Sequence, residues 1–301
     1  MHAVFAIEPE AVDNWQDLRF VLGHCGYSNG LLIAQFPKSW ARMVIEACDR
    51  KGVGAIDRTR IVELLRQAKE NRLVRVGLPF NGNDWLNSAR SENVRDTFSA
   101  IIVRNKIEEE GFYCLAEVDD ELFRNRREVQ VERNAKALAE AARYVLMSSE
   151  RIVMVDPYFE AKARCCKVIQ AMIELCRDGE HRLSEIVICT SSSTDRSPRY
   201  HDADIYRELL SESLGQDIAL KVLLLPVDDL KYDFHARYLF SRRAGLRFDR
   251  GFVEPGDHDQ RDHLTDVVCL TDALVEELNS RYLDEASFIS GAETILLPLV
   301  D

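Results

Sequence analysis

Residues 151–159 read Arg-Ile-Val-Met-Val-Asp-Pro-Tyr-Phe, an apolar run that stops at an Asp-Pro pair. A short apolar run of this kind is typical of a buried strand. The next segment, Lys162–Arg177, carries apolar residues at helical spacing and is followed by Asp178-Gly179, which predicts a helix end. Strands that alternate with helices predict an α/β sandwich, in which helices pack on a mixed sheet. Further strands are expected over 183–189, 218–225 and 266–270, and further helices over 131–147, 204–214 and 272–283.

A second informative segment is Phe234-His-Ala-Arg-Tyr-Leu-Phe240, which Arg242-Arg-Ala-Gly245 separates from the apolar stretch Leu246–Phe252. The two stretches predict a β-hairpin. In an alternating strand, His235 and Arg237 point to the same face. A neutral imidazole can attack phosphorus and a guanidinium can hold two phosphate oxygens, so this pair predicts a phosphate site. The alternative is an ordinary polar strand face.

These segments together resemble the phospholipase D superfamily: one strand runs into Asp156-Pro-Tyr158, another into Thr190-Ser191, and His235-x-Arg237 follows with glycines downstream. More narrowly, residues 129–283 are similar to the phospholipase D-like C-terminal domain of microtubule-interacting-and-trafficking (MIT) domain proteins and to its bacterial relatives. The resemblance implies a phospholipase D-like α/β sandwich with His235 and Arg237 as the catalytic pair. The substrate-binding residues expected with that pair are Asp156, Tyr158, Thr190, Ser191, Arg247 and Asp249.

One position departs from the superfamily motif, in which His-x-Lys is followed after four residues by Asp. Arg237 replaces the lysine, as it does in the MIT-type branch, and Arg242 stands at the Asp position. This arginine removes an expected supporting carboxylate and adds a positive charge. Asp249, on the return strand of the hairpin, could supply a carboxylate instead, and Arg247 belongs to a cluster of arginines that could attract a phosphate.

The sequence holds a single His-x-Lys/Arg motif, whereas the superfamily reaction uses two histidines. One histidine forms the phosphohistidine and the other protonates the leaving oxygen. One-motif members of the superfamily obtain the second histidine by pairing two identical chains. The resemblance therefore implies a homodimer with both His235 residues at one cleft, a nucleic acid or another phosphodiester as partner, and no metal or other cofactor.

An ordinary structural explanation exists as well for Asp156 and for Thr190–Ser193, and also for an acidic stretch further along the chain. Asp156 could equally cap the helix that follows it. The hydroxyls and N–H groups of Thr190–Ser193 suit a phosphate, but the segment could be a serine-rich surface turn. Glu254–Asp259 and Asp262-His263 contain residue types that bind metals, yet Pro255-Gly256 forces a loop, so we expect a solvated acidic loop there and no metal site.

A composition shift around Val118–Arg127 predicts a boundary between one domain over 1–125 and a second domain over 126–301. The first domain is expected to be smaller and to have a mostly helical α+β fold. No group of residues in it predicts catalysis. Its strands are expected at 31–36 and 73–76 and its helices at 39–49, 57–68 and 91–103, with Asn83 or Asp84 capping another.

The composition indicates a soluble protein of the cytoplasm without a transmembrane segment. Every apolar run falls short of the roughly 18 residues that span a bilayer, and the acidic N-terminal region does not resemble a secretory signal. The eight cysteines include no Cys-x-x-Cys pair, and we expect all of them to be buried thiols in a reducing compartment. The net charge of −12, with 32 acidic and 23 basic residues after residue 125, limits a phosphate site to a small positive island.

The sequence therefore favours a metal-independent phosphodiesterase, with a nuclease as the leading hypothesis. The first alternative is a non-catalytic module that binds nucleic acid or a phosphoinositide headgroup in the same pocket. A second alternative is that the C-terminal domain only dimerises the chain while the N-terminal domain recognises a target. The bacterial relatives also suggest a role in phage defence, by association alone.

Overall fold

Two separate sheets organise the chain. The computed structural model describes residues 1–80, 82, 84–118, 121–124, 126–177, 183–192, 200–226, 234–256, 263–284 and 292–297. The chain divides into an N-terminal unit, residues 2–127, and a C-terminal unit, residue 1 with residues 128–301. This division follows Arg127, slightly beyond the boundary expected from composition. Each unit combines helices with a sheet that contains parallel strands, so the expected α/β class is confirmed.

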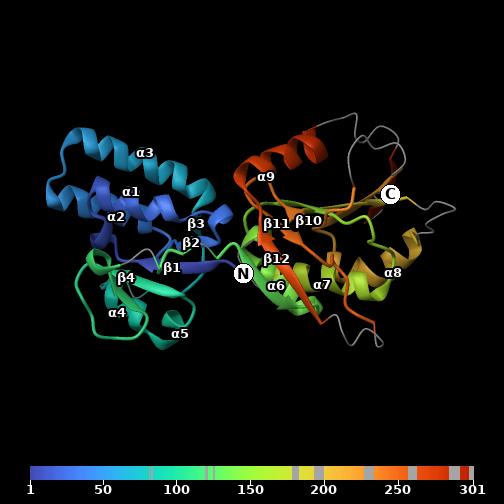
Figure 1. Cartoon of the computed structure of the whole chain (residues 1–301), viewed down its shortest axis with the longest axis horizontal. Helices are drawn as coiled ribbons and strands as arrows, with labels where there is room; N and C mark the ends of the chain where they lie inside the picture. The colour runs from blue at the N-terminus through green and yellow to red at the C-terminus, as the bar shows by residue number, and fades with distance from the viewer. Residues whose placement is uncertain are drawn as a thin grey trace. The chain divides into compact units, whose positions relative to one another are not determined.

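The N-terminal unit is built on a five-stranded sheet in the order β3-β2-β1-β4-β5, in which every neighbouring pair is parallel. Its strands are β1 (Ala3–Ile7), β2 (Leu31–Ala34), β3 (Leu73–Val74), β4 (Ala100–Val103) and β5 (Phe112–Cys114). Its helices are α1 (Trp15–His24), α2 (Trp40–Lys51), α3 (Ala55–Asn71), α4 (Trp85–Arg90) and α5 (Glu92–Arg95). Helices α1, α2 and α3 cover one face of the sheet, and α4 and α5 lie on the other (Figure 1). The unit is therefore doubly wound, and its strand order reverses between β1 and β4.

The α+β class expected for this unit is wrong, because its sheet is parallel throughout, whereas the expected excess of helix over strand is confirmed among its described residues. Strands β1 and β4 read AVFAI and AIIV, because a central parallel strand is buried on both faces and shows no alternation. The segment predicted as a helix over 91–103 instead contains the short helix α5 and then β4. The start of α4, in contrast, is confirmed: the Asp84 side chain accepts hydrogen bonds from the N–H groups of Leu86 and Asn87.

Charged side chains meet beyond the carboxyl ends of β1 and β4. The buried Asp13 carboxylate accepts hydrogen bonds from Lys51 Nζ at 2.5 Å and from an Nη atom of Arg104 at 2.8 Å. The backbone N–H of Arg104 donates to Glu8 Oε2 at 2.7 Å, and burial raises the pKa of Glu8. These contacts tie the segment after β1 to the end of α2 and to the segment after β4, so they support the point where the strand order reverses.

The C-terminal unit contains an eight-stranded mixed sheet in the order β13-β9-β8-β7-β10-β11-β12-β6. Strands β7, β8 and β9 are parallel to one another, and the other pairs are antiparallel. The strands are β6 (Glu128–Glu132), β7 (Arg151–Val155), β8 (Glu185–Ser191), β9 (Ala219–Leu225), β10 (Tyr238–Phe240), β11 (Gly245–Phe248), β12 (Leu264–Cys269) and β13 (Glu293–Leu297). The helices are α6 (Ala135–Leu146), α7 (Ala163–Arg177), α8 (Ala203–Leu214) and α9 (Asp272–Asn279). Helix α9 covers the face opposite to α6, α7 and α8 (Figure 1).

The register of this sheet brings the two informative segments of the sequence together. Val155 at the end of β7 pairs with Tyr238 at the start of β10, and Tyr238 pairs with Arg247 in the hairpin partner β11. Asp156 directly follows Val155, and Arg237 directly precedes Tyr238. These two residues therefore lie side by side where β7 ends and β10 begins. The expected hairpin is confirmed, and β10 is also the neighbour of β7, although His235 and Arg237 precede β10 and do not lie within it.

The cysteines are unpaired and, with one exception, buried. All eight cysteines are free thiols, seven of them buried, and burial raises the pKa of Cys25 and of Cys189 to about 12. Cys114 is the exception to the expected burial, since it is partly exposed and its Sγ donates to the Arg104 carbonyl.

No helix of the described residues has the length and apolar character needed to cross a membrane.

Acid should destabilise the N-terminal unit through His2. This histidine is buried, its Nε2 lies 3.2 Å from the Tyr27 carbonyl oxygen, and burial lowers its pKa to about 3. The unfolded chain, with a histidine pKa of about 6.5, then binds a proton that the folded unit excludes. Stability should fall by about 1.4 kcal/mol for each pH unit between these two values.

The three tryptophans, Trp15, Trp40 and Trp85, all lie in the N-terminal unit, so tryptophan fluorescence reports its unfolding. Denaturant titrations from pH 7 to pH 3 should give a flatter loss of stability for His2→Gln than for the wild type. His24→Gln, at a partly exposed position, is the matched control and should show the same pH slope as the wild type. Equal pH slopes for all three proteins would show that His2 does not titrate in this way.

Candidate functional site

Four side chains converge where β7 ends and β10 begins: Asp156, Tyr158, His235 and Arg237, which we call the β7-edge cluster. The Tyr158 hydroxyl lies 3.3 Å from His235 Nδ1. The Arg237 guanidinium carbon lies 4.9 Å from the centre of the Tyr158 ring, within the range of a cation–π contact. Arg237 Nε is 3.9 Å from Asp156 Oδ1. The sequence predicted all four residues, and the structure brings them together.

Asp156 is the buried anchor of this cluster. Its Oδ1 accepts a hydrogen bond from the Tyr158 N–H at 2.9 Å, and its Oδ2 accepts one from the Phe252 N–H at 3.1 Å. Both carboxylate oxygens are thus engaged by the protein, and the side chain is buried. These contacts give Asp156 a structural role, because it joins the turn after β7 to the segment after β11; its expected part in substrate binding stays a prediction. It does not cap α7, which begins at Ala163.

Gly251 is required by this anchor. Its φ is +74°, in the left-handed region that residues with a side chain rarely adopt. A Cβ atom at this position would lie 2.4 Å from Asp156 Oδ2 and 2.9 Å from Arg237 Cδ. Glycine therefore allows the chain to pass directly over the carboxylate and the arginine stem.

The side chains of Thr190 and Ser191 hold the turn that follows β7. Thr190 is fully buried and its hydroxyl donates to the Phe159 carbonyl at 2.9 Å. The Ser191 hydroxyl donates to the Pro157 carbonyl at 2.5 Å and is also buried. Each hydroxyl thus already donates to a backbone carbonyl of the turn that carries Tyr158, and the expected binding of phosphate by these two residues stays a prediction. Ser193, the last residue of that predicted segment, lies outside the described residues.

Arg237 is held in place but keeps donors to spare. One Nη atom donates to the Asp249 carbonyl at 2.7 Å, and the side chain is 27% exposed. Within the described part of the chain this is the one hydrogen bond of the guanidinium, which carries five N–H groups. Tyr158 is 41% exposed and His235 is exposed. A cation and an imidazole are thus presented to solvent from a rigid edge, an arrangement that can bind a phosphate and attack it.

Three further candidate residues take other places. Arg247 pairs with Tyr238 and therefore faces the side of the sheet opposite to Arg237, because successive residues of a strand alternate. The Asp249 carboxylate is exposed and lies 3.6 Å from Arg250, so this residue contributes its carbonyl to the cluster and not a carboxylate. Arg242 lies in the hairpin turn, at the far end of β10. Sequence spacing could not separate these roles, because the hairpin register decides them.

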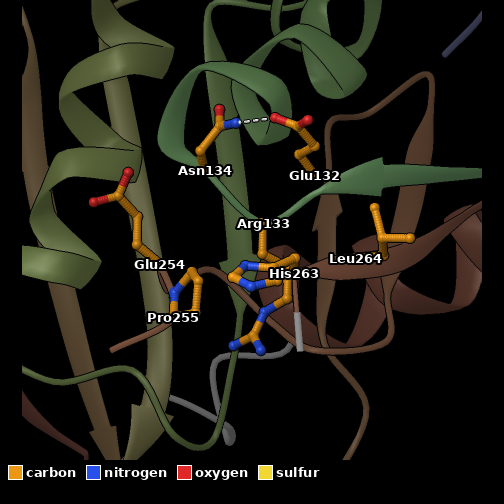
Figure 2. A pocket seen from close by; sticks show the side chains of 7 residues that line it. All are labelled: Glu132, Arg133, Asn134, Glu254, Pro255, His263 and Leu264. Carbon is orange, nitrogen blue, oxygen red and sulfur yellow. Dashed lines mark hydrogen bonds between the residues drawn. The ribbon is translucent and has the colours of Figure 1, made fainter. Parts of the chain in front are cut away.

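A pocket of about 590 Å³ lies further along the same sheet edge, where β6 ends and β12 begins (Figure 2). It was missed by the sequence reasoning, which treated the 254–263 segment as a solvated acidic loop. Glu254 is instead a structural residue: its Oε1 accepts from the Ala135 N–H at 2.9 Å, at the start of α6, and its Oε2 is 3.7 Å from Lys167 Nζ. Residues 257–262 lie outside the described residues. The pocket is lined by Glu132, Arg133, Asn134, Glu254, Pro255, His263 and Leu264.

Among the described residues, no three His, Cys, Asp or Glu side chains gather closely enough to hold a metal ion. A search of protein-family models gives no match to the chain, and a search of curated proteins gives none either.

Gly251→Ala should loosen the cluster by more than backbone strain alone would explain. The matched control is Gly111→Ala, since Gly111 has a φ of +85° and its Cβ would meet no atom within 4 Å. Both variants should lose about 1–2 kcal/mol from the left-handed conformation. In addition, Gly251→Ala should speed amide hydrogen exchange in peptides that cover 151–159 and 234–240, because the new methyl displaces Asp156. Unchanged exchange in those peptides would contradict the anchoring role of Asp156.

Proposed function

We propose that the C-terminal unit is a phospholipase D-like domain that hydrolyses phosphodiester bonds, with nucleic acid as its substrate class. The observation that carries this proposal is the contact of one exposed tyrosine with both His235 and Arg237, at 3.3 Å and 4.9 Å. This contact holds a potential nucleophile beside a potential phosphate ligand. The mixed α/β sheet and the glycine that passes over Asp156 agree with the same resemblance.

The reaction would proceed in two steps at His235, without a metal ion. In the first step, the Nε2 lone pair attacks phosphorus, so that a P–N bond forms and the P–O bond to the leaving group breaks. A second, protonated histidine gives its proton to the leaving oxygen. In the second step, that histidine takes a proton from water and the resulting hydroxide attacks phosphorus, so that a P–O bond forms, the P–N bond breaks and His235 is released. Arg237 would hold non-bridging oxygens throughout.

We propose that the second histidine is His235 of another copy of the chain, because the sequence contains a single His-x-Lys/Arg motif. The homodimer would then be required for catalysis and would form one composite site from two β7-edge clusters. The buried free thiols are consistent with action in the reducing cytoplasm.

The position of Arg242 favours a second candidate function, a non-catalytic module. No carboxylate stands where the superfamily motif has its Asp, and Arg242 lies in the hairpin turn. A module of this kind would bind nucleic acid or a phosphoinositide headgroup through Arg237 without cleaving it. Binding without turnover by the purified chain would select this alternative.

His235→Ala should abolish hydrolysis. The full-length chain is incubated in chelator with bis(p-nitrophenyl) phosphate and with single- and double-stranded DNA and RNA. Loss of the nucleophile and of the general acid should lower the rate by more than about a hundredfold. His24→Ala, in the N-terminal unit, is the matched control and should keep wild-type activity. Hydrolysis that survives in His235→Ala would remove this residue from the reaction.

The same variant tests the composite site. Wild-type and His235→Ala chains are mixed at several ratios under conditions that allow exchange of subunits, and the oligomeric state is measured by sedimentation. If each site needs two His235 residues, activity should fall with the square of the wild-type fraction. A linear fall, or a monomer that is fully active, would contradict the shared site.

Arg237→Ala should weaken phosphate binding by about ten- to a hundredfold, because a charge-assisted hydrogen bond is lost. Arg237→Lys should weaken it less, since the charge is kept and the paired donors are lost. Arg247→Ala, which removes an arginine from the opposite face, is the control and should bind as the wild type does. Affinity for inorganic phosphate and the Tm are measured together. A large fall in Tm with unchanged phosphate affinity would assign Arg237 to the fold alone.

A further inference from the structure

Tyr158 is fixed at three points, which sets the place of its hydroxyl. Its backbone N–H donates to the buried Asp156 carboxylate at 2.9 Å, and its ring lies against the Arg237 guanidinium. Its hydroxyl lies 3.3 Å from Nδ1 of His235. The turn beneath it is held by the hydroxyls of Thr190 and Ser191. A polar group is thus presented to one particular nitrogen of the imidazole.

The identity of that nitrogen matters because the two ring nitrogens of a neutral histidine have different roles. One carries hydrogen and the other carries a lone pair, and the hydrogen bond made by one nitrogen sets the state of the other. A tyrosine hydroxyl can accept a hydrogen bond from Nδ1–H. In that case the lone pair is on Nε2, which is the nitrogen that must attack phosphorus.

We propose that the Tyr158 hydroxyl is the positioning group of His235: it accepts a hydrogen bond from Nδ1–H and so keeps the lone pair on Nε2. This inference rests on the proposed function of the cluster and specifies how its nucleophile is prepared. It also assigns to a neutral hydroxyl the supporting task that a carboxylate would have at the position of Arg242. The ring of the same residue orients Arg237, so one side chain aligns the nucleophile and the phosphate ligand.

Tyr158→Phe separates these two tasks, because it removes the hydroxyl and keeps the ring against Arg237. Tyr158→Ala removes both. Tyr200→Phe is the matched control: this tyrosine is exposed, and its backbone N–H donates to Glu160 Oε1 in the neighbouring loop. All variants are made in the full-length chain, and their folding is checked by circular dichroism.

The first readout needs no substrate. Two-bond proton–nitrogen NMR correlations of the ¹⁵N-labelled histidines distinguish the Nδ1–H from the Nε2–H form, and His235→Ala identifies the His235 signals. Neutral His235 should be in the Nδ1–H form in the wild type and in Tyr200→Phe. Tyr158→Phe should shift the population toward Nε2–H. An unchanged tautomer in a folded Tyr158→Phe protein would overturn the proposal.

The second readout is the steady-state hydrolysis of bis(p-nitrophenyl) phosphate. Tyr158→Phe should lower kcat by about tenfold, the equivalent of one hydrogen bond, and should leave KM within about twofold. Tyr158→Ala should also raise KM, because Arg237 loses the ring. Unchanged kcat in Tyr158→Phe, with hydrolysis that still depends on His235, would reject the positioning role while the proposed function stands. Absence of hydrolysis in the wild type would reject the enzymatic function, and the tautomer shift would still decide the role of Tyr158.

Discussion

The arrangement of the C-terminal site depends on the buried carboxylate of Asp156. It stands at the end of a central parallel strand and accepts two backbone hydrogen bonds, one from the turn that follows and one from Phe252, far along the chain. Because a buried carboxylate is costly unless its oxygens are satisfied, the segments that satisfy it must stay in place. Arg237, 3.9 Å away, adds the compensating charge. The anchor therefore joins the end of β7, the start of β10 and the segment after β11.

Several residues that look reactive in the sequence are used to support this anchor. The hydroxyls of Thr190 and Ser191 donate hydrogen bonds to carbonyls of the turn, and Gly251 leaves room for the carboxylate. The groups left accessible are those of Tyr158, His235 and the outer part of Arg237. Such a division suits a catalytic site, because reacting groups need a surround that holds them within a few tenths of an ångström.

The strands of the two units differ in how clearly the sequence pattern marks them. In the C-terminal unit, short apolar strands end at clear turn residues, such as Asp156-Pro157, and the helices between them are strongly amphipathic. In the N-terminal unit, β1 and β4 are buried on both faces, and the charged residues beyond them, Asp13 and Arg104 among them, form ion pairs with each other. The acidic segment after β1 is therefore part of the structural support of the sheet.

The sequence by itself determined the α/β class, most elements of the C-terminal unit, the hairpin, and four residues of the candidate site, because local periodicity and turn residues act over short stretches. It could not determine the parallel sheet of residues 2–127, since a strand buried on both faces has no alternation to detect. Nor could it assign Asp156, Thr190 and Ser191 to structural roles, or place Arg247 on the opposite face from Arg237. Only the tertiary structure decided these points, because strand register and the satisfaction of buried polar groups depend on partners distant in the chain.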